Sequence, residues 1–186
     1  MTLYSKIINF FETSKSKHLL GFVSFIESIF FPIPPDLILI PMVLSKKFDW
    51  MRLALLTTLT SVLGGILGYY IGIFLFNEIN IYIIEYGYLN DFNFVKNIFI
   101  EYGVLVLFIS GFTPIPYKIF TITAGFMAVN IFMFIGVSII GRGLRFYLVA
   151  YLTNKYREDI NLYLSKYLLQ ITALVLIVFL IYKLYI

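Results

Sequence analysis

Long apolar segments alternate with short polar ones along the chain, and their lengths predict an all-α, polytopic membrane protein. Leu53–Phe76, Ile131–Tyr151 and Tyr167–Ile186 are each long enough to cross a hydrocarbon core of about 30 Å, at about 1.5 Å per helical residue. We therefore expect about three spanning helices.

Two further apolar segments, Leu19–Leu44 and Val104–Val129, are as long in total but are interrupted near the middle. The interruptions are closely spaced prolines: Pro32, Pro34, Pro35, Pro114 and Pro116. Proline breaks a helix and biases the preceding residue away from helical geometry. Each half then has about 10 to 13 residues, or roughly 15 to 20 Å of helix, and neither half spans alone. We expect each segment to form a re-entrant helical hairpin.

The two breaks are similar in sequence, which indicates an internal repeat. Pro32-Ile33-Pro34-Pro35-Asp36 matches Pro114-Ile115-Pro116-Tyr117-Lys118, and each motif ends in a charge, of opposite sign. We expect an inverted-repeat arrangement within a single membrane domain covering residues 1–186. The first repeat comprises about residues 19–76 and the second about residues 104–151.

The distribution of basic residues favours hairpins over continuous spans. If both broken segments fold back, the segments before residue 19, at 45–52 and after residue 151 share one side, and 77–103 lies on the other. The first side then collects most of the bases: Lys6, Lys15, Lys17, Lys46, Lys47, Arg52, Lys155, Arg157 and Lys166. The positive-inside rule makes that side cytoplasmic. We expect the N-terminus inside and the C-terminus outside.

Two polar segments between the apolar ones predict surface helices. Asn77–Gly103 is rich in both aromatic and polar residues, and aromatic rings favour the headgroup level of a membrane, so an interfacial amphipathic helix is expected there. Asn154–Lys166 predicts a similar helix on the inner side.

Composition strengthens the membrane assignment and restricts the chemistry. Hydrophobic residues make up 61% and charged residues 13% of the 186, which leaves too little polar surface for a soluble domain. The chain has no cysteine and one histidine, His18, so thiol catalysis and the usual zinc ligand sets are excluded. We expect no enzyme activity, no cofactor, no metal and no nucleic-acid partner, and we interpret His18 as interfacial.

The first hairpin carries two candidate functional acids. Glu27 lies in an apolar segment, and an acid at membrane depth normally faces a cavity or a partner. A shallow hairpin that leaves Glu27 in interfacial water is the alternative. Asp36 follows Pro35, where it can cap the returning half-helix, and a functional role is compatible with capping.

The second half carries three candidate cations. Lys118 is disfavoured by the helix dipole at a helix N-terminus and therefore needs a nearby anion: Glu27, Asp36 or a ligand phosphate. Arg142 and Arg145 share a helical face. They either extend to the headgroups or bind a phosphate, which suits the planar arginine fork.

Gly64, Gly68 and Gly72 form a smooth face along the first spanning helix. Small residues at this spacing let helices pack closely in lipid. We expect this face to hold a hairpin, with a homodimer seam as the alternative.

Three motifs in order resemble the DedA (VTT-domain) superfamily and, within it, the YqaA-like branch. They are Glu27 followed by Phe31-Pro32-Ile33-Pro34-Pro35-Asp36, then Gly111-Phe112-Thr113-Pro114-Ile115-Pro116-Tyr117-Lys118 with Ala124-Gly125, and Gly141-Arg142-Gly143-Leu144-Arg145-Phe146. The resemblance covers about residues 18–165. It implies a bacterial inner-membrane protein with two re-entrant hairpins that translocates lipids, such as polyprenyl phosphate or phospholipid. The family's critical acids correspond to Glu27 and Asp36, whereas Lys118 stands where many members carry an arginine-containing motif.

Together these features predict a lipid flippase or scramblase. The hairpin tips meet near mid-membrane, where Lys118, Arg142 and Arg145 receive a lipid phosphate. Glu27 and Asp36 balance those charges and, by taking up protons in turn, couple movement to a proton gradient. The expected partners are lipids with an anionic or phosphate-bearing headgroup, protons and a second copy in a homodimer. The alternatives are a proton-coupled transporter of small ions or solutes and a non-transporting assembly or homeostasis factor.

Overall fold

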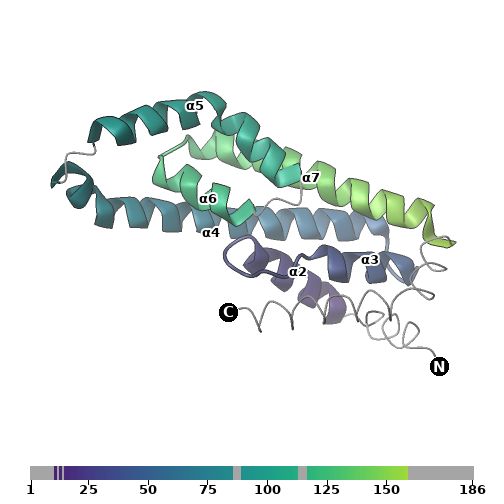
Figure 1. Cartoon of the computed structure of the whole chain (residues 1–186). Helices are drawn as coiled ribbons and strands as arrows, with labels where there is room; N and C mark the ends of the chain where they lie inside the picture. The colour runs from purple at the N-terminus through teal and green to yellow at the C-terminus, as the bar shows by residue number, and fades with distance from the viewer. Residues whose placement is uncertain (1–10, 12, 14, 86–88, 113–116, 159–186) are drawn as a thin grey trace, which may run out of the picture.

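Two long antiparallel helices form the axis of the molecule. The computed structural model describes residues 11, 13, 15–85, 89–112 and 117–158, and all regular structure within these ranges is helical. Helices α4 (Trp50–Glu85) and α7 (Ile131–Lys155) pack side by side and run in opposite directions (Figure 1). Both are long and apolar enough to cross a membrane, as the sequence predicts. The third predicted span, Tyr167–Ile186, lies outside the described residues.

The first proline-broken segment folds back on itself. Helices α2 (Lys15–Glu27) and α3 (Asp36–Leu44) run in opposite directions along one side of α4 (Figure 1). The end of α2 tightens into a turn because the backbone N–H groups of Ile29, Phe30 and Phe31 all donate to the carbonyl of Ile26. With 13 and 9 residues, α2 and α3 extend about 20 and 14 Å, less than the thickness of a hydrocarbon core.

The second broken segment also folds back, in the opposite sense. Helix α5 (Leu89–Phe112) is followed by α6 (Tyr117–Phe126), which packs against α4 (Figure 1). The break itself, residues 113–116 with Pro114 and Pro116, lies outside the described residues. Only Glu101–Phe112 of α5 is apolar. A fold-back followed by a long helix therefore occurs twice in the chain.

One sequence prediction is wrong. Asn77–Gly103 does not form a separate interfacial helix, because α4 continues to Glu85 and α5 begins at Leu89. The segment has no proline, so its backbone hydrogen bonds extend both helices through the polar residues. Of the second predicted surface helix, Asn154–Lys166, the structure describes residues only up to 158, and α7 ends at Lys155 within it.

Buried apolar residues form two clusters along the molecule. One joins the α2–α3 hairpin to α4 and α7 and includes Leu20, Leu39, Met42, Val43, Leu53, Phe146 and Ala150. The other joins α4, α5, α6 and α7 and includes Tyr69, Leu107, Ala124, Met127, Val129 and Phe134. The hydroxyl of Tyr69 donates to the carbonyl of Val129 at 2.6 Å, which ties α4 to the turn before α7. The polar residues described below lie between these clusters.

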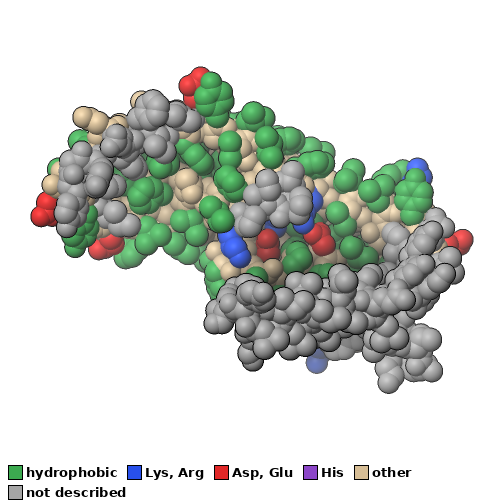
Figure 2. Space-filling model, in the orientation of Figure 1, with side chains coloured by type: hydrophobic (Ala, Val, Ile, Leu, Met, Phe, Trp, Pro, Cys, Tyr) green, Lys and Arg blue, Asp and Glu red, His purple; other side chains and the backbone are tan. Residues whose placement is uncertain are grey.

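The outward faces of the two long helices are apolar. Large exposed side chains follow one another along them: Leu55, Leu59, Leu63 and Leu67 on α4, and Phe132, Ile140, Leu144 and Leu148 on α7. Figure 2 shows hydrophobic side chains over most of the described surface on the face in view. Exposed apolar surface of this extent is unfavourable in water and suits contact with lipid.

Candidate functional site

Glu27 and Arg142 form a buried ion pair between the two halves of the chain. Glu27 is the last residue of α2, and Arg142 lies near the middle of α7. Arg142 Nη2 donates to Glu27 Oε2 at 2.5 Å, and the two side chains are 2% and 15% exposed. Neither side chain is lipid-facing, so the hairpin turns its acid inward rather than toward interfacial water.

Arg142 contacts groups of α4, α6 and its own helix α7. Its Nε donates to Ser61 Oγ of α4 at 2.6 Å. The guanidinium lies over the rings of Tyr117 and Phe146, 4.8 and 4.7 Å from their centroids. Cation–π contacts of this kind favour a cation that is removed from water. Arg142 therefore does not extend to the headgroups.

A serine pair extends the polar network between α2 and α4. Ser28 Oγ and Ser61 Oγ lie 2.8 Å apart, and Ser28 Oγ also donates to Glu27 Oε2 at 3.4 Å. Both serines are fully buried. Glu27, Ser28, Ser61 and Arg142 therefore form one connected group, which we call the central network.

Asp36 and Arg145 form a second ion pair beside the first. Asp36 is the first residue of α3, and its Oδ2 accepts from Arg145 Nη2 at 2.5 Å. The residue at the cap position is Pro35, and Asp36 makes no side-chain capping bond. Its other oxygen, Oδ1, is buried and has no hydrogen-bond partner in the described part of the chain. Asp36 thus binds Arg145 through Oδ2, while its Oδ1 accepts no hydrogen bond from a described residue.

Lys118 joins the tips of the two fold-backs. Its Nζ donates to the carbonyl oxygens of Phe30 and Phe31, at 3.1 and 3.2 Å. The partner of this cation is therefore the peptide backbone rather than either acid that we considered. Carbonyls just beyond the end of a helix lack intrahelical partners and carry partial negative charge, which explains the contact.

The glycine face of α4 is covered by both fold-backs. A Cβ atom at Gly64 would collide with the carbonyl oxygen of Phe25 in α2, and one at Gly72 with that of Ile122 in α6. At Gly68 it would lie 2.6 Å from Thr121 Oγ1 of α6. Since the hairpins of the same chain occupy this face, it is not available as a dimer seam.

The fold brings all five predicted charged residues to the middle of the molecule. Figure 2 shows acidic and basic side chains side by side there, between apolar surfaces. Of the predicted break residues, Pro32, Pro34 and Pro35 form the turn between α2 and α3, whereas Pro114 and Pro116 are not described. Within the described ranges, no group of three or more His, Asp or Glu residues is placed to hold a metal ion.

Sequence reasoning missed three residues of the central region: Ser28, Ser61 and Tyr117. Each carried a usable signal. Ser61 precedes Gly64 and Gly68 by three and seven positions, so helical periodicity puts it on the glycine face. Ser28 adjoins Glu27, and Tyr117 adjoins Lys118.

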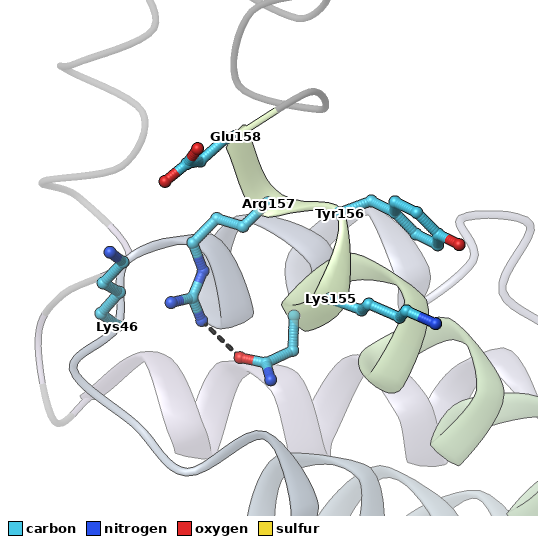
Figure 3. A pocket seen from close by; sticks show the side chains of 6 residues that line it. Lys46, Lys155, Tyr156, Arg157 and Glu158 are labelled. Carbon is cyan, nitrogen blue, oxygen red and sulfur yellow. Dashed lines mark hydrogen bonds between the residues drawn. The ribbon is translucent and has the colours of Figure 1, made fainter.

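The described basic residues outside the central region and α5 lie at one end of the molecule, where α2 and α4 begin and α3 and α7 end: Lys15, Lys17, Lys46, Lys47, Arg52, Lys155 and Arg157. This end also has a polar hollow of about 300 Å³, lined by Lys46, Asn154, Lys155, Tyr156, Arg157 and Glu158 (Figure 3). Arg157 donates to Asn154 Oδ1 at 2.7 Å and to the carbonyl of Val43 at 2.9 Å. The charge asymmetry between the ends agrees with the loop pattern in the sequence.

Comparison with known proteins adds a family match. The VTT domain matches residues 31–155, which include Asp36, Arg142 and Arg145 but not Glu27. An uncharacterized protein of Haemophilus influenzae is 42% identical over 149 residues, or 80% of this chain and 78% of the relative. An uncharacterized protein of Histophilus somni is 39% identical over 151 residues, covering 81% and 79%. No solved structure matches the chain.

Proposed function

The chain belongs to the VTT domain (DedA) family, and from this premise we propose that it moves a phosphate-bearing lipid across a membrane. The family is membrane-associated and transporter-like in character, which agrees with the two spanning-length helices. The proposed cargo is a phospholipid or a polyprenyl phosphate. The process involves no covalent step and no cofactor.

The observation that carries the proposal is the gathering of opposite charges where the two fold-backs meet. Glu27 and Asp36 of the first repeat pair with Arg142 and Arg145 of α7, while Lys118 joins the two tips. Ionisable groups inside a membrane protein are costly, and they usually mark the path of a polar or charged substrate. Paired broken helices that bring such groups to mid-depth are typical of transporters.

In the proposed mechanism, each of the two carboxylates binds an arginine in the resting state, and a lipid phosphate then replaces the carboxylate. Arginine presents the same planar fork of donors to a carboxylate and to a phosphate, so one anion can replace the other. Protonation of Glu27 or Asp36 removes the competing charge and couples the exchange to a proton gradient. The buried Oδ1 of Asp36 supports this role, because it accepts no hydrogen bond from any described residue.

The lengths of the helices support a re-entrant arrangement. Helices α2, α3 and α6 extend about 20, 14 and 15 Å, so none of them crosses a core of about 30 Å. We propose that the α2–α3 hairpin enters and leaves from the basic side and the α5–α6 hairpin from the other. The positive-inside rule then makes the basic end cytoplasmic, with the N-terminus inside. The proposed membrane is the inner membrane of a bacterial cell. The third predicted span, Tyr167–Ile186, places the C-terminus outside.

The test is lipid flipping in proteoliposomes that carry a fluorescent phospholipid, read by chemical quenching of the outer leaflet. Glu27→Gln and Lys118→Ala should each abolish protein-dependent flipping while the protein remains folded. Glu78→Gln and Lys155→Ala are the matched controls, since they remove the same charges at exposed positions away from the tips. Both controls should flip lipid like the unmodified protein.

Ion flux measured in the same vesicles separates the alternatives. Flux of protons or small ions without lipid movement would make the chain a solute transporter and overturn the proposed cargo. Full flipping activity in Glu27→Gln and in Lys118→Ala would remove the central charges from the mechanism.

A further inference from the structure

Two cavities lie between α2 and the beginning of α4, and no described residue that lines them belongs to the central network. Two adjoining cavities follow the junction of α2 with the beginning of α4, and they share Lys17 and Leu56. One cavity, of about 330 Å³, lies at the basic end of the molecule. The other, of about 450 Å³, continues from it along the helices. We call the two together the α2–α4 groove.

The end of the groove is cationic. Lys17, Lys47 and Arg52 line it, and none of them forms a salt bridge with a described residue. Lys17 Nζ lies 4.7 Å from the centroid of the Phe48 ring, which holds the ammonium at the cavity wall. Asp49 is the acid in this cavity, and its Oδ1 accepts from the backbone N–H of Met51 at 2.7 Å. The cavity therefore has three cations against one carboxylate that already serves a helix start.

The continuation of the groove is largely apolar. Its walls include Phe22 of α2 and Leu56 of α4, and Phe22 is 62% exposed. Gly21 lies between them, where an added Cβ would be 3.3 Å from Thr60 Cγ2. This short distance shows that α2 and α4 are in close contact at Gly21, so the apolar surface that the groove offers is that of Phe22 and Leu56.

We propose that the α2–α4 groove holds one anionic phospholipid of the leaflet at the basic end. The headgroup phosphate contacts Lys17, Lys47 and Arg52, and one acyl chain lies along Phe22 and Leu56. A cationic mouth that continues into an apolar channel complements an amphiphile with an anionic head, and basic residues at a membrane surface attract anionic lipids. The site is separate from the central network and goes beyond the proposed transport function.

The hollow shown in Figure 3 provides a natural comparison. It lies at the same end and contains Lys46, Lys155 and Arg157, and among the described residues that line it only Tyr156 has a large apolar side chain. Charge alone should not select a phospholipid there. Removing cations from the hollow therefore controls for the general loss of positive charge.

The experiment is native mass spectrometry of the full chain in detergent, titrated with phosphatidylglycerol or with zwitterionic phosphatidylcholine. The unmodified protein should retain one phosphatidylglycerol at least tenfold more tightly than phosphatidylcholine. The double variant Lys17→Gln/Arg52→Gln should weaken phosphatidylglycerol binding about 30-fold, which corresponds to about fivefold for each surface cation. Lys46→Gln/Lys155→Gln should change it less than threefold. If the double variant folds poorly, Lys47→Gln alone should still weaken binding about fivefold.

The acyl-chain contact is tested separately. Phe22→Ser should weaken binding of long-chain phosphatidylglycerol about fivefold and leave binding of a dihexanoyl form unchanged, because only the long chain reaches the apolar wall. Phe132→Ser, at an exposed position at the start of α7, is the matched control and should have no effect.

Three results would overturn this proposal: equal retention of the two lipids, equal losses in the groove and hollow variants, or unchanged binding in Lys17→Gln/Arg52→Gln. The outcome is independent of the transport mechanism, because the readout is binding. Glu27→Gln should lose flipping and keep the bound phosphatidylglycerol.

Discussion

Glu27 and Arg142 are 115 positions apart in the chain, yet Glu27 Oε2 accepts a hydrogen bond from Arg142 Nη2 at 2.5 Å. The contact joins the end of α2 in the first half to the middle of α7 in the second. Arg142 is almost completely buried, so the pair exists only because both halves pack around it. This dependence makes the pair a test of the fold as well as of the site.

Removing one partner of this pair should destabilise the protein more than removing both charges. Arg142→Gln leaves Glu27 without its cation, and breaking a buried ion pair costs about 3–5 kcal/mol. Glu27→Gln/Arg142→Gln leaves two neutral amides, so a coupling of about 1–3 kcal/mol should appear in a double-mutant cycle. Unfolding of the single and double variants in detergent measures it. Strictly additive losses would show that the two side chains do not interact.

Ser61 should matter more than another buried serine of the bundle. Ser61→Ala removes the acceptor of Arg142 Nε and the partner of Ser28, and a buried group left without its hydrogen bond costs about 1–3 kcal/mol. Ser110→Ala is the matched control, because among the described residues the partner of Ser110 Oγ is the carbonyl of Leu107 in its own helix. Thermal unfolding should show the larger loss for Ser61→Ala. Equal losses would contradict the role of Ser61 in the central network.

The glycine contacts predict opposite effects for the same substitution at two sites. Gly72→Ala places a Cβ against the carbonyl of Ile122 and the N–H of Phe126, so α4 and α6 must move apart and the melting temperature should fall. Gly136→Ala meets nothing within 4 Å and should stabilise α7 by up to about 1 kcal/mol, since alanine favours a helix. A neutral Gly72→Ala would mean that α6 does not pack at that distance.

Lys118 should restrain the turn of the first hairpin. Lys118→Met removes both donors to Phe30 and Phe31, and amide hydrogen exchange in residues 28–35 should accelerate roughly tenfold, as expected for loss of hydrogen bonds from a charged group. Lys155→Met, which removes a lysine that lies over the rings of Tyr151 and Tyr156, should leave exchange in this turn unchanged. Unaltered exchange in Lys118→Met would show that the two tips are not coupled.

The long apolar elements were predictable from the sequence because length and composition determine them. Leu53–Phe76 and Ile131–Tyr151 correspond to α4 and α7, and the prolines at 32, 34 and 35 mark the turn after α2. Helix ends were less predictable. Helix α2 already ends at Glu27, because the turn is closed by three N–H groups that converge on the carbonyl of Ile26, which no sequence pattern reports.

The error at Asn77–Gly103 has a physical cause. Polarity and aromatic content indicate where a segment meets the membrane surface, whereas the continuity of a helix depends on its backbone hydrogen bonds. Helices α4 and α5 therefore extend through residues that composition assigns to an interface. Composition alone does not distinguish a surface helix from the ends of two long ones.

The charged residues of the central region were predictable, but their partners were not. An acid or base in an apolar segment stands out in any sequence. Which cation meets which acid depends on the packing of α2 and α3 against α7, and Lys118 meets backbone carbonyls that carry no sequence signal. Ser61 lies on the glycine face of α4 by helical periodicity, but its contact with Arg142 depends on the packing of α7 against α4.

The most direct test of the account is the side of the membrane from which single cysteines react. The chain has no native cysteine, so Ser45→Cys, Asn90→Cys and Asn154→Cys can each be labelled with a membrane-impermeant reagent in sealed vesicles of known orientation. Re-entrant hairpins predict that positions 45 and 154 react from the cytoplasmic side and position 90 from the opposite side. Reaction of positions 45 and 154 from opposite sides would show that the second broken segment crosses the membrane, because α4 and α7 each cross once between them, and it would contradict the meeting of charges on which the proposed function depends.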